Sequence, residues 1–448
     1  MDLKNKKVTV VGLGNSGLNA AILLDDMGAD VRVTDSRDNT DIRNNVNVLK
    51  DMENKIEIGG HTRDFIKGSE LVILSPGVED SSPAVRWATE LKVPMISELE
   101  LGFRFCKGRI IAITGTNGKS TVTTLIGEVL KKAGMDTVVC GNIGNSLCGE
   151  IRRISGRTFI VLEASSFQLE RTVEFKPHIA AILNIADDHL DRYKNKEDYF
   201  NEKLKIFRNQ DEGDVLILNY DAKNLRPLKD KARSRTLFYS KHDKVAGAYV
   251  RDGEIICSLD GEGHRLCSIN DIRYLKGAHN LENVLVSSLV SALVGVDAKF
   301  IRDTIRNFKG LPHRFETIGI LGDIEFVDDS KGTTVDSTYR ALESCEVPVI
   351  LIAGGRDKNS DYTVIKDLIR EKVRFLILIG EARERIKKAL GDAVDTCYAA
   401  TMSEAVEISC RLAKGRTLVL LSPMCPSFDM FKDDIFGKRD LCCGEDGG

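Results

Sequence analysis

The sequence contains few of the features that mark fibrous, secreted or membrane-spanning chains. Among its 448 residues are 9 prolines and a single tryptophan, which argues against a proline-rich scaffold. It has no run of about 18 apolar residues, so we expect no transmembrane helix. The N-terminus, Met1-Asp2-Leu3-Lys4, lacks the pattern of a signal peptide. None of the 11 cysteines forms a C-x-x-C pair, and we expect reduced thiols rather than disulfides or a zinc site.

The sequence also lacks an excess of charge of either sign. Its 64 Lys and Arg residues nearly balance 67 Asp and Glu residues, giving a formal net charge of −3. This balance removes any whole-protein electrostatic argument for binding nucleic acid or an anionic membrane. Hydrophobic residues make up 42% and charged residues 29%, as in globular proteins. The composition predicts a cytoplasmic protein of several domains, without nucleic-acid or membrane partners.

Short β-branched runs alternate with helical stretches along most of the chain, which predicts β-α units on parallel sheets. The sequence groups into three α/β domains, with breaks near residues 97 and 310: 1–97, 98–310 and 311–448. The stretch from about 215 to 275 is less regular and favours short, partly antiparallel strands. We expect a Rossmann-like first domain, a central domain like the phosphate-loop ATPases with a mainly parallel sheet, and a Rossmann-like last domain.

The strongest motif lies between a predicted strand at 110–113 and an amphipathic helix that Gly134 ends. It reads Gly115-Thr116-Asn117-Gly118-Lys119-Ser120-Thr121. Its glycines let backbone N–H groups turn toward phosphate oxygens, and the helix N-terminus adds partial positive charge. Lys119 is expected to reach the terminal phosphates, and the hydroxyl of Ser120 or Thr121 can bind Mg²⁺. The motif favours phosphate binding over an ordinary glycine turn.

A second glycine motif, Gly12-Leu13-Gly14-Asn15-Ser16-Gly17, follows the first predicted strand, with Asp35 after the second. This is the pattern of a dinucleotide-binding turn, which favours an NAD-linked dehydrogenase. A glycine turn that leads into a helix accepts any diphosphate, however, including that of a UDP-sugar. The separate phosphate loop shifts the balance from redox chemistry toward nucleoside triphosphate chemistry.

Carboxylates follow two further strands of the central domain. Glu163 closes one strand, and Asp187, Asp188 and His189 follow another, whose end is Asn184. Strand ends in α/β sheets converge on the ligand crevice, so these groups can meet phosphates and Mg²⁺. By residue type alone, His189 also fits a solvated loop and the Asp pair a helix cap. Nothing in the local pattern separates Lys203 from a surface lysine.

Six separated motifs occur in the order found in the Mur ligases, and the chain resembles that family of ATP-dependent amide ligases. Three further segments, at 11–17, 141–144 and 354–358, resemble the members that add D-glutamate to UDP-N-acetylmuramoyl-L-alanine. The six motifs are Gly115–Thr121, Glu163–Leu169, Asp188–Asp191, His279–Asn283, Leu311–Arg314 and Asp329–Lys331.

The resemblance implies ATP and Mg²⁺ as cofactors, the two small molecules as substrates, and a monomer. It implies metal binding by Ser120, Glu163, His189 and a carbamylated Lys203, and catalysis by Lys119, Glu163, His189, Lys203 and Lys331. ATP would lie on residues 115–121 (Gly115, Thr116, Asn117, Gly118, Lys119, Ser120, Thr121) and on Asn283, Arg314 and Asp329. The UDP-substrate would bind at Gly14, Asn15, Ser16, Asp35, Ser36 and Asn142, and D-glutamate at Thr333, Lys358 and Ser427.

Two other functions remain open from the residues themselves. An NAD-linked oxidoreductase would leave the phosphate loop unexplained, and a nucleotide-binding switch would bind or hydrolyse ATP without ligation. After Phe431 the sequence departs from the usual Mur ligase pattern, in a segment that includes Lys432, Gly437 and Arg439.

Overall fold

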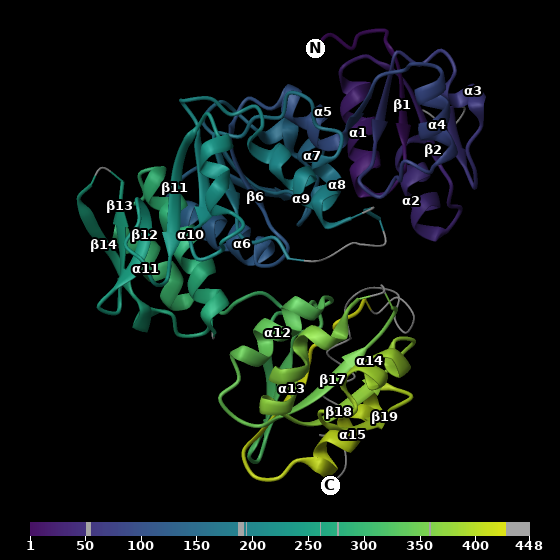
Figure 1. Cartoon of the computed structure of the whole chain (residues 1–448). Coiled ribbons are helices and arrows are strands. Elements are labelled where there is room, and N and C mark those ends of the chain that lie inside the picture. The colour runs from purple at the N-terminus through teal and green to yellow at the C-terminus, as the bar shows by residue number, and fades with distance from the viewer. Residues whose placement is uncertain are drawn as a thin grey trace. The chain divides into compact units, whose positions relative to one another are not determined.

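The computed structural model describes residues 1–50, 55–186, 192–193, 195–259, 261–275, 277–357 and 360–426. Three separate β-sheets with their helices make up this part of the chain, which confirms the α/β class with three domains (Figure 1). The chain forms two compact units: residues 1–185, 197–269 and 283–305 in one, and residues 186–196, 270–282 and 306–448 in the other. The domain boundaries near 97 and 310 remain predictions. No helix within the described residues combines the length and the apolar character needed to cross a membrane.

The first sheet has five parallel strands in the order β3-β2-β1-β4-β5. Alternate residues of β1 enter two different cores: Val8 and Val10 pack with α1, and Val11 packs with α4. A sheet buried on both faces explains the continuous apolar strands. The elements are β1 (Lys7–Val11), α1 (Asn15–Asp26), β2 (Asp30–Asp35), α2 (Thr40–Val48), β3 (Ile56–Ile58), α3 (Arg63–Ile66), β4 (Leu71–Leu74), α4 (Pro83–Glu90) and β5 (Met95–Ser97).

The second sheet has nine strands in the order β14-β13-β12-β11-β10-β9-β6-β8-β7. Strands β6 to β12 pair with one another in parallel. Strand β13 pairs antiparallel with both β12 and β14, so the less regular region is mixed in direction. The elements up to the ninth strand are α5 (Glu98–Phe105), β6 (Arg109–Thr114), α6 (Lys119–Lys132), β7 (Thr137–Gly141), α7 (Leu147–Glu150), β8 (Phe159–Glu163), α8 (Ser166–Leu169) and β9 (Ile179–Ile182). The others are α9 (Lys196–Leu204), β10 (Val215–Asn219), β11 (Arg235–Ser240), β12 (Gly247–Arg251), β13 (Glu254–Ser258), β14 (Gly263–Ser268), α10 (Ala278–Leu293) and α11 (Ala298–Asn307).

The third sheet has six strands in the order β15-β16-β20-β17-β18-β19, all parallel except β15. One face of β17 packs on α12 to α14 and the other on α15, which gives two cores. The elements are β15 (Glu316–Leu321), β16 (Ile324–Asp328), α12 (Val335–Glu343), β17 (Val349–Gly354), α13 (Lys366–Lys372), β18 (Val373–Ile379), α14 (Arg383–Leu390), β19 (Asp395–Tyr398), α15 (Met402–Leu412) and β20 (Thr417–Leu421).

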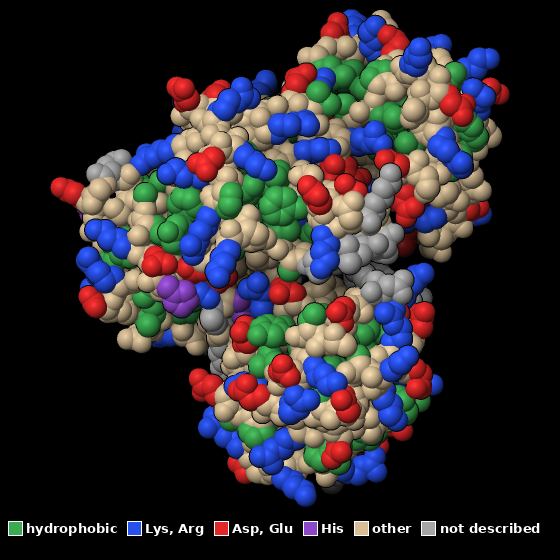
Figure 2. All heavy atoms as spheres, viewed as in Figure 1, with side chains coloured by type: hydrophobic (Ala, Val, Ile, Leu, Met, Phe, Trp, Pro, Cys, Tyr) green, Lys and Arg blue, Asp and Glu red, His purple; other side chains and the backbone are tan. Residues whose placement is uncertain are grey.

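Basic and acidic side chains are interspersed on the face of the molecule shown in Figure 2. This distribution agrees with the near-zero net charge of the sequence. A surface that mixes both signs favours solubility over attraction to a polyanion.

Candidate functional site

The phosphate-loop motif joins β6 to α6 in a turn that requires glycine. Gly118 is the N-cap of α6 and has φ +87°, a left-handed conformation that a side chain disfavours. A Cβ at this position would lie 2.5 Å from Asn283 Oδ1. The turn and Asn283 are therefore in close contact, and the structure brings together two elements that the sequence assigns to one nucleotide.

Lys119 begins α6, and its ammonium group lies against the loop itself. Its Nζ donates hydrogen bonds to the carbonyl oxygens of Gly115 and Thr116, each at 2.9 Å. The loop therefore holds a cation at the N-terminus of a helix, where backbone N–H groups have no acceptor in the helix's own ladder. This arrangement suits the oxygens of a phosphate.

Lys203 differs from the surface lysine that its local sequence suggested, because its side chain is only 1% exposed. Its Nζ donates to Gly115 O at 2.9 Å and lies 4.6 Å from the centre of the Tyr199 ring. Tyr199 OH lies 3.2 Å from Thr116 Oγ1, so one face of α9 packs on the phosphate loop. Tyr199 and Lys203 are four residues apart and share that face. The spacing alone does not identify a buried lysine, because the tertiary structure decides which face of α9 is covered.

Glu163 lies at the end of β8 and is 2% exposed. Its Oε1 accepts a hydrogen bond from Asn142 Nδ2 at 2.8 Å, whereas its Oε2 has no hydrogen-bond partner among the described residues. A buried carboxylate oxygen without a donor is costly unless a cation or water satisfies it. The residue therefore fits the hard oxygen ligand that Mg²⁺ requires, and Ser120 supplies a hydroxyl in the first turn of α6. The other metal candidate, His189, and the neighbouring Asp187 and Asp188 lie outside the described residues.

A pocket of about 700 Å³ lies beside the carboxyl ends of the first sheet. The opposite wall comes from the second sheet, through the turn after β7 and Gln168 of α8. Two glycine turns thus face one space, which has the size of a small-molecule site. The pocket contains every residue that the sequence assigned to the UDP-substrate: Gly14, Asn15, Ser16, Asp35, Ser36 and Asn142.

Close packing explains the glycines of the first turn. Gly12 has φ +90°, and a Cβ on Gly17 would lie 1.8 Å from Gly12 O. Asp35 holds the turn, because its Oδ2 accepts a hydrogen bond from Leu13 N–H at 2.6 Å. Burial of Asp35 opposes its ionisation, but hydrogen bonds from Arg37 and Leu13 outweigh burial and lower its pKa. An ionised carboxylate therefore fixes this wall of the pocket.

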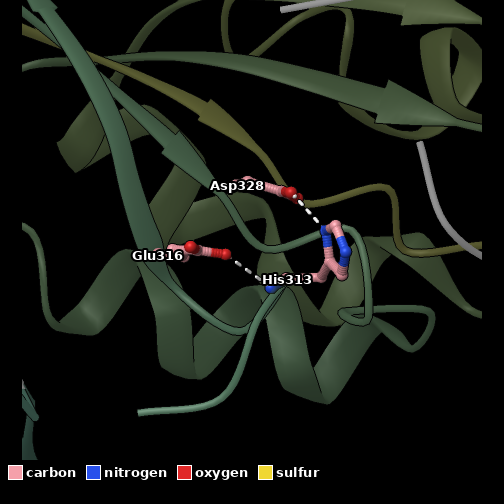
Figure 3. Close-up of side chains that lie close together, drawn as sticks. All are labelled: His313, Glu316 and Asp328. Atoms are coloured by element: carbon pink, nitrogen blue, oxygen red, sulfur yellow. Dashed lines mark hydrogen bonds and ion pairs between the residues drawn. The ribbon is translucent and has the colours of Figure 1, made fainter. Parts of the chain in front are cut away.

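In the second unit, a strained turn before β15 presents Arg314. Its neighbours His313 and Phe315 have φ +64° and +47°. Figure 3 shows Asp328 and Glu316 holding the turn: His313 Nδ1 lies 2.7 Å from Asp328 Oδ2, and His313 N–H donates to Glu316 Oε2 at 2.9 Å. Ligand atoms of these three side chains lie within 4.8 Å of one another, as in a metal site. Their hydrogen bonds assign them instead to shaping the turn.

Asp329 follows β16 and is enclosed by the same turn. Its Oδ1 accepts a hydrogen bond from Phe315 N–H at 3.2 Å, and its Oδ2 accepts one from Ser422 Oγ at 2.7 Å. Burial raises the pKa of Asp329 to about 7, although Ser422 and Arg314 act in the opposite direction. Lys331 N–H donates to His313 O at 3.2 Å, so Arg314, Asp329 and Lys331 all lie on one hydrogen-bonded loop pair.

The structure describes fewer of the residues expected at the D-glutamate site. Thr333 lies directly before Thr334, the N-cap of α12, in the second unit. Lys358, Ser427 and the divergent segment after Phe431 lie outside the described residues. Asn184 also contacts the phosphate loop. From the sequence it was expected only to end a strand.

Curated relatives resemble the chain along almost its full length. A UDP-N-acetylmuramoylalanine–D-glutamate ligase of Thermoanaerobacter pseudethanolicus is 41% identical over 97% of this chain and 96% of its own. A protein of the same name from Geotalea daltonii is 42% identical over 97% of this chain and 95% of its own.

Solved structures with lower identity share the fold. A UDP-N-acetylmuramate–alanine ligase from Thermotoga maritima has a TM-score of 0.60 at 19% identity, covering 97% of this chain and 98% of its own. A MurF ligase from Thermotoga maritima in complex with ADP has a TM-score of 0.57 at 14% identity, covering 98% of this chain and 94% of its own.

Family comparisons match all three parts of the chain. Residues 6–97 match the MurD-like N-terminal domain of the Mur ligases, residues 113–291 the Mur ligase middle domain, and residues 313–425 the Mur ligase glutamate ligase domain. Together with the phosphate loop, the buried Glu163 and the pocket of the first sheet, these matches set the NAD-linked alternative aside. The chain belongs to the Mur ligase family.

Proposed function

We propose that the protein is an ATP-dependent ligase that adds D-glutamate to UDP-N-acetylmuramoyl-L-alanine during synthesis of the peptidoglycan precursor. The observation that carries the proposal is the full-length similarity, about 40% identity over 97% of the chain, to relatives named for this reaction. The pocket between the two glycine turns supports it, because it suits a substrate that carries a diphosphate.

The reaction needs ATP because a carboxylate has a poor leaving group. The terminal carboxylate of UDP-N-acetylmuramoyl-L-alanine attacks the γ-phosphorus of ATP, the bond to the bridging oxygen breaks, and ADP leaves. The amine of D-glutamate then attacks the carbonyl carbon of the acyl phosphate. Phosphate departs, an amide forms, and the amine loses a proton. Catalysis of such a transfer consists mainly of positioning and of neutralising phosphate charge.

We propose that Lys119 contacts the terminal phosphates and that Lys331 joins it during transfer. Lys119 is suited to this role by its position at the start of α6, where loop carbonyls already hold its ammonium group. Asn283 lies against Gly118 and would contact the base, while Arg314 and Asp329 would contact the rest of the nucleotide. Thr333, Lys358 and Ser427 would receive D-glutamate.

Mg²⁺ is a proposed cofactor, held by Glu163 and Ser120, with His189 as a further ligand. The support is the buried Oε2 of Glu163, to which no group in the described part of the chain donates a hydrogen bond. When bound, the ion would neutralise phosphate charge. Asn142 would keep the carboxylate of Glu163 oriented through its hydrogen bond.

Carbamylation of Lys203 is proposed from the family resemblance, and its burial beside the phosphate loop supports the proposal. The modification turns a cation into an oxygen-bearing anion. Protein incubated with isotope-labelled bicarbonate should show a carbamate carbonyl signal by nuclear magnetic resonance. The signal should be absent from Lys203→Ala. A labelled signal in both proteins would assign the carbamate to another amine.

We also propose that the protein acts in the cytoplasm as a monomer. All nine cysteines among the described residues are free, as expected for a reducing compartment. Light scattering should give a mass near 49.5 kDa. A stable dimer would contradict the monomer.

The function is tested by phosphate release with ATP, Mg²⁺ and UDP-N-acetylmuramoyl-L-alanine, scanned over D-glutamate, L-glutamate, lysine and NAD. We expect release only with D-glutamate, coupled to formation of one amide. Lys119→Ala should abolish turnover and keep the folded state, because its side chain lies at a loop–helix junction. Release that is independent of the amino acid would favour a nucleotide-binding switch.

A further inference from the structure

The side chain of Asn184 forms a two-point contact with the phosphate loop. Its Oδ1 accepts a hydrogen bond from Asn117 N–H at 2.8 Å, and its Nδ2 donates to Asn117 O at 3.0 Å. The carboxamide therefore satisfies the donor and the acceptor of one loop residue at the same time. Its own carbonyl oxygen accepts a third bond, from Thr116 N–H at 2.9 Å.

The contact continues the pairing between β9 and β6 beyond the ends of both strands. Leu183 N–H donates to Thr114 O at 3.0 Å, immediately before Asn184 reaches the loop. On the other side of Leu183, Tyr239 OH donates to Leu183 O at 3.0 Å. Asn184 is thus attached to a paired strand, which holds it beside the loop.

These bonds decide which loop donors can face a phosphate. The N–H groups of Thr116 and Asn117 donate to Asn184, so a phosphate would use other N–H groups of the motif, such as those of Gly118 and the first turn of α6. Asn117 also immediately precedes Gly118, whose left-handed conformation sets the direction of that turn. Fixing the Asn117 peptide therefore fixes the geometry with which the helix begins.

We propose that Asn184 is a positioning residue that holds the phosphate loop in its nucleotide-binding conformation. The inference rests on the proposed function, since it assumes that the loop binds ATP. Without the carboxamide, the N–H and the carbonyl group of Asn117 lose these two hydrogen bonds, and the loop can adopt other conformations. Nucleotide binding must then supply the cost of ordering the loop, which lowers affinity.

The test measures ADP binding by calorimetry in the presence of Mg²⁺. Asn184→Ala should weaken ADP binding by about tenfold or more, because two hydrogen bonds that order the loop are lost. Affinity for the UDP-substrate, measured separately, should change by less than about twofold. The variant should also raise KM for ATP more than it lowers kcat.

Asn219→Ala is the matched control. Asn219 also ends a strand of the same sheet, β10, and its Oδ1 accepts a backbone hydrogen bond from Asp221 N–H at 2.9 Å. Its bond is to its own turn rather than to the phosphate loop. ADP affinity should therefore be preserved, and an equal loss in both variants would overturn the inference in favour of a general effect on the sheet.

Asn184→Asp provides a second readout that a purely structural role would not give. Its carboxylate keeps the acceptor for Asn117 N–H but places a second acceptor against Asn117 O. Protonation of that carboxylate restores a hydrogen-bond donor to Asn117 O. The ADP affinity of Asn184→Asp, compared with that of the parent protein, should therefore recover as pH falls. Asn184→Ala should show no such recovery. If Asn184→Ala bound ADP as tightly as the parent protein, the role of Asn184 would be overturned and the proposed function would stand. Failure of the parent protein to ligate D-glutamate would overturn the proposed function.

Discussion

At the scale of single residues, burial separates the groups with chemical roles from those that only resemble them. Glu163 and Lys203 are 2% and 1% exposed, and each contacts the phosphate loop or the turn beside the pocket. Burying a charge is costly, so such groups persist where partners or ligands compensate. The lysine shows this most clearly, because its sequence context gave no reason to choose it.

Glu163→Gln should lower turnover by about a hundredfold or more and keep the fold. Gln keeps the shape and can still accept the hydrogen bond from Asn142, but it removes the charge that a divalent cation needs. Phosphate release, titrated with Mg²⁺, measures the effect.

Glu150→Gln is the control for this substitution. Glu150 is also buried, and its Oε1 accepts a hydrogen bond from Asn145 at 3.1 Å, but it pairs with Arg153 rather than facing the loop. It should keep Mg²⁺ dependence unchanged. Full activity in Glu163→Gln would remove Glu163 from the metal site.

Asp329 should make the protein less stable as pH rises. Its pKa is about 7 in the folded protein against 3.8 ordinarily, so the folded state binds the extra proton between these values. Stability from this group is therefore present at low pH and is lost as pH rises through about 7. Asp329→Asn lacks this loss. Its free energy of unfolding, compared with that of the parent protein, should therefore rise between pH 3.8 and about 7 and then stay constant. Denaturation at a series of pH values measures it, and parallel curves would refute it.

At the scale of elements, a glycine with positive φ lies at each end of α6, and only the one at its start belongs to the phosphate loop. Gly118 precedes the helix with φ +87°, and Gly134 follows it with φ +78°, as the sequence predicted for the helix end. Only the first has a neighbour in the way: a Cβ on Gly118 would meet Asn283, whereas a Cβ on Gly134 would meet nothing within 4 Å. A side chain would therefore be strained at either position, but only at Gly118 would it also meet a neighbour.

Gly118→Ala should therefore abolish detectable ADP binding, because the loop must move away from Asn283 to admit the methyl group. Gly134→Ala should bind ADP normally and lose about 1–2 kcal/mol of stability, the usual cost of a left-handed conformation outside glycine. Calorimetry and thermal unfolding distinguish the two results. Normal ADP binding by Gly118→Ala would show that contact with Asn283 does not constrain the loop.

At the scale of the whole molecule, the residues proposed to bind ATP are divided between the two compact units. Lys119 and Asn283 belong to the first unit, whereas Arg314, Asp329 and Lys331 belong to the second. A reaction that joins three substrates gains from holding them together, by about 7–11 kcal/mol when orientation is good. The division favours closure of the units on bound substrates.

The scattering profile should therefore change when an ATP analogue and UDP-N-acetylmuramoyl-L-alanine bind together. We expect a profile that differs from the profile with either ligand alone, because residues from both units are proposed to contact the nucleotide. Small-angle X-ray scattering measures this. An unchanged profile would contradict hinge closure.

The sequence by itself determined the α/β class, the three sheets, both glycine turns and the Mur ligase family. The α/β class, the sheets and the turns depend on local periodicity and on glycines at fixed spacing, which are written directly in the chain. The family was recognised from the resemblance of separated motifs. Gly115 and Gly118 could be chosen because no other residue adopts their conformation so readily.

Tertiary structure alone decided which polar side chains meet those turns. Asn184 and Lys203 reach the phosphate loop from distant segments, and Asp35 is occupied by holding Leu13 N–H. Such contacts depend on strand order and on the face that each helix buries. Neighbouring residues do not encode that information, because the partners become adjacent only after the sheet has formed.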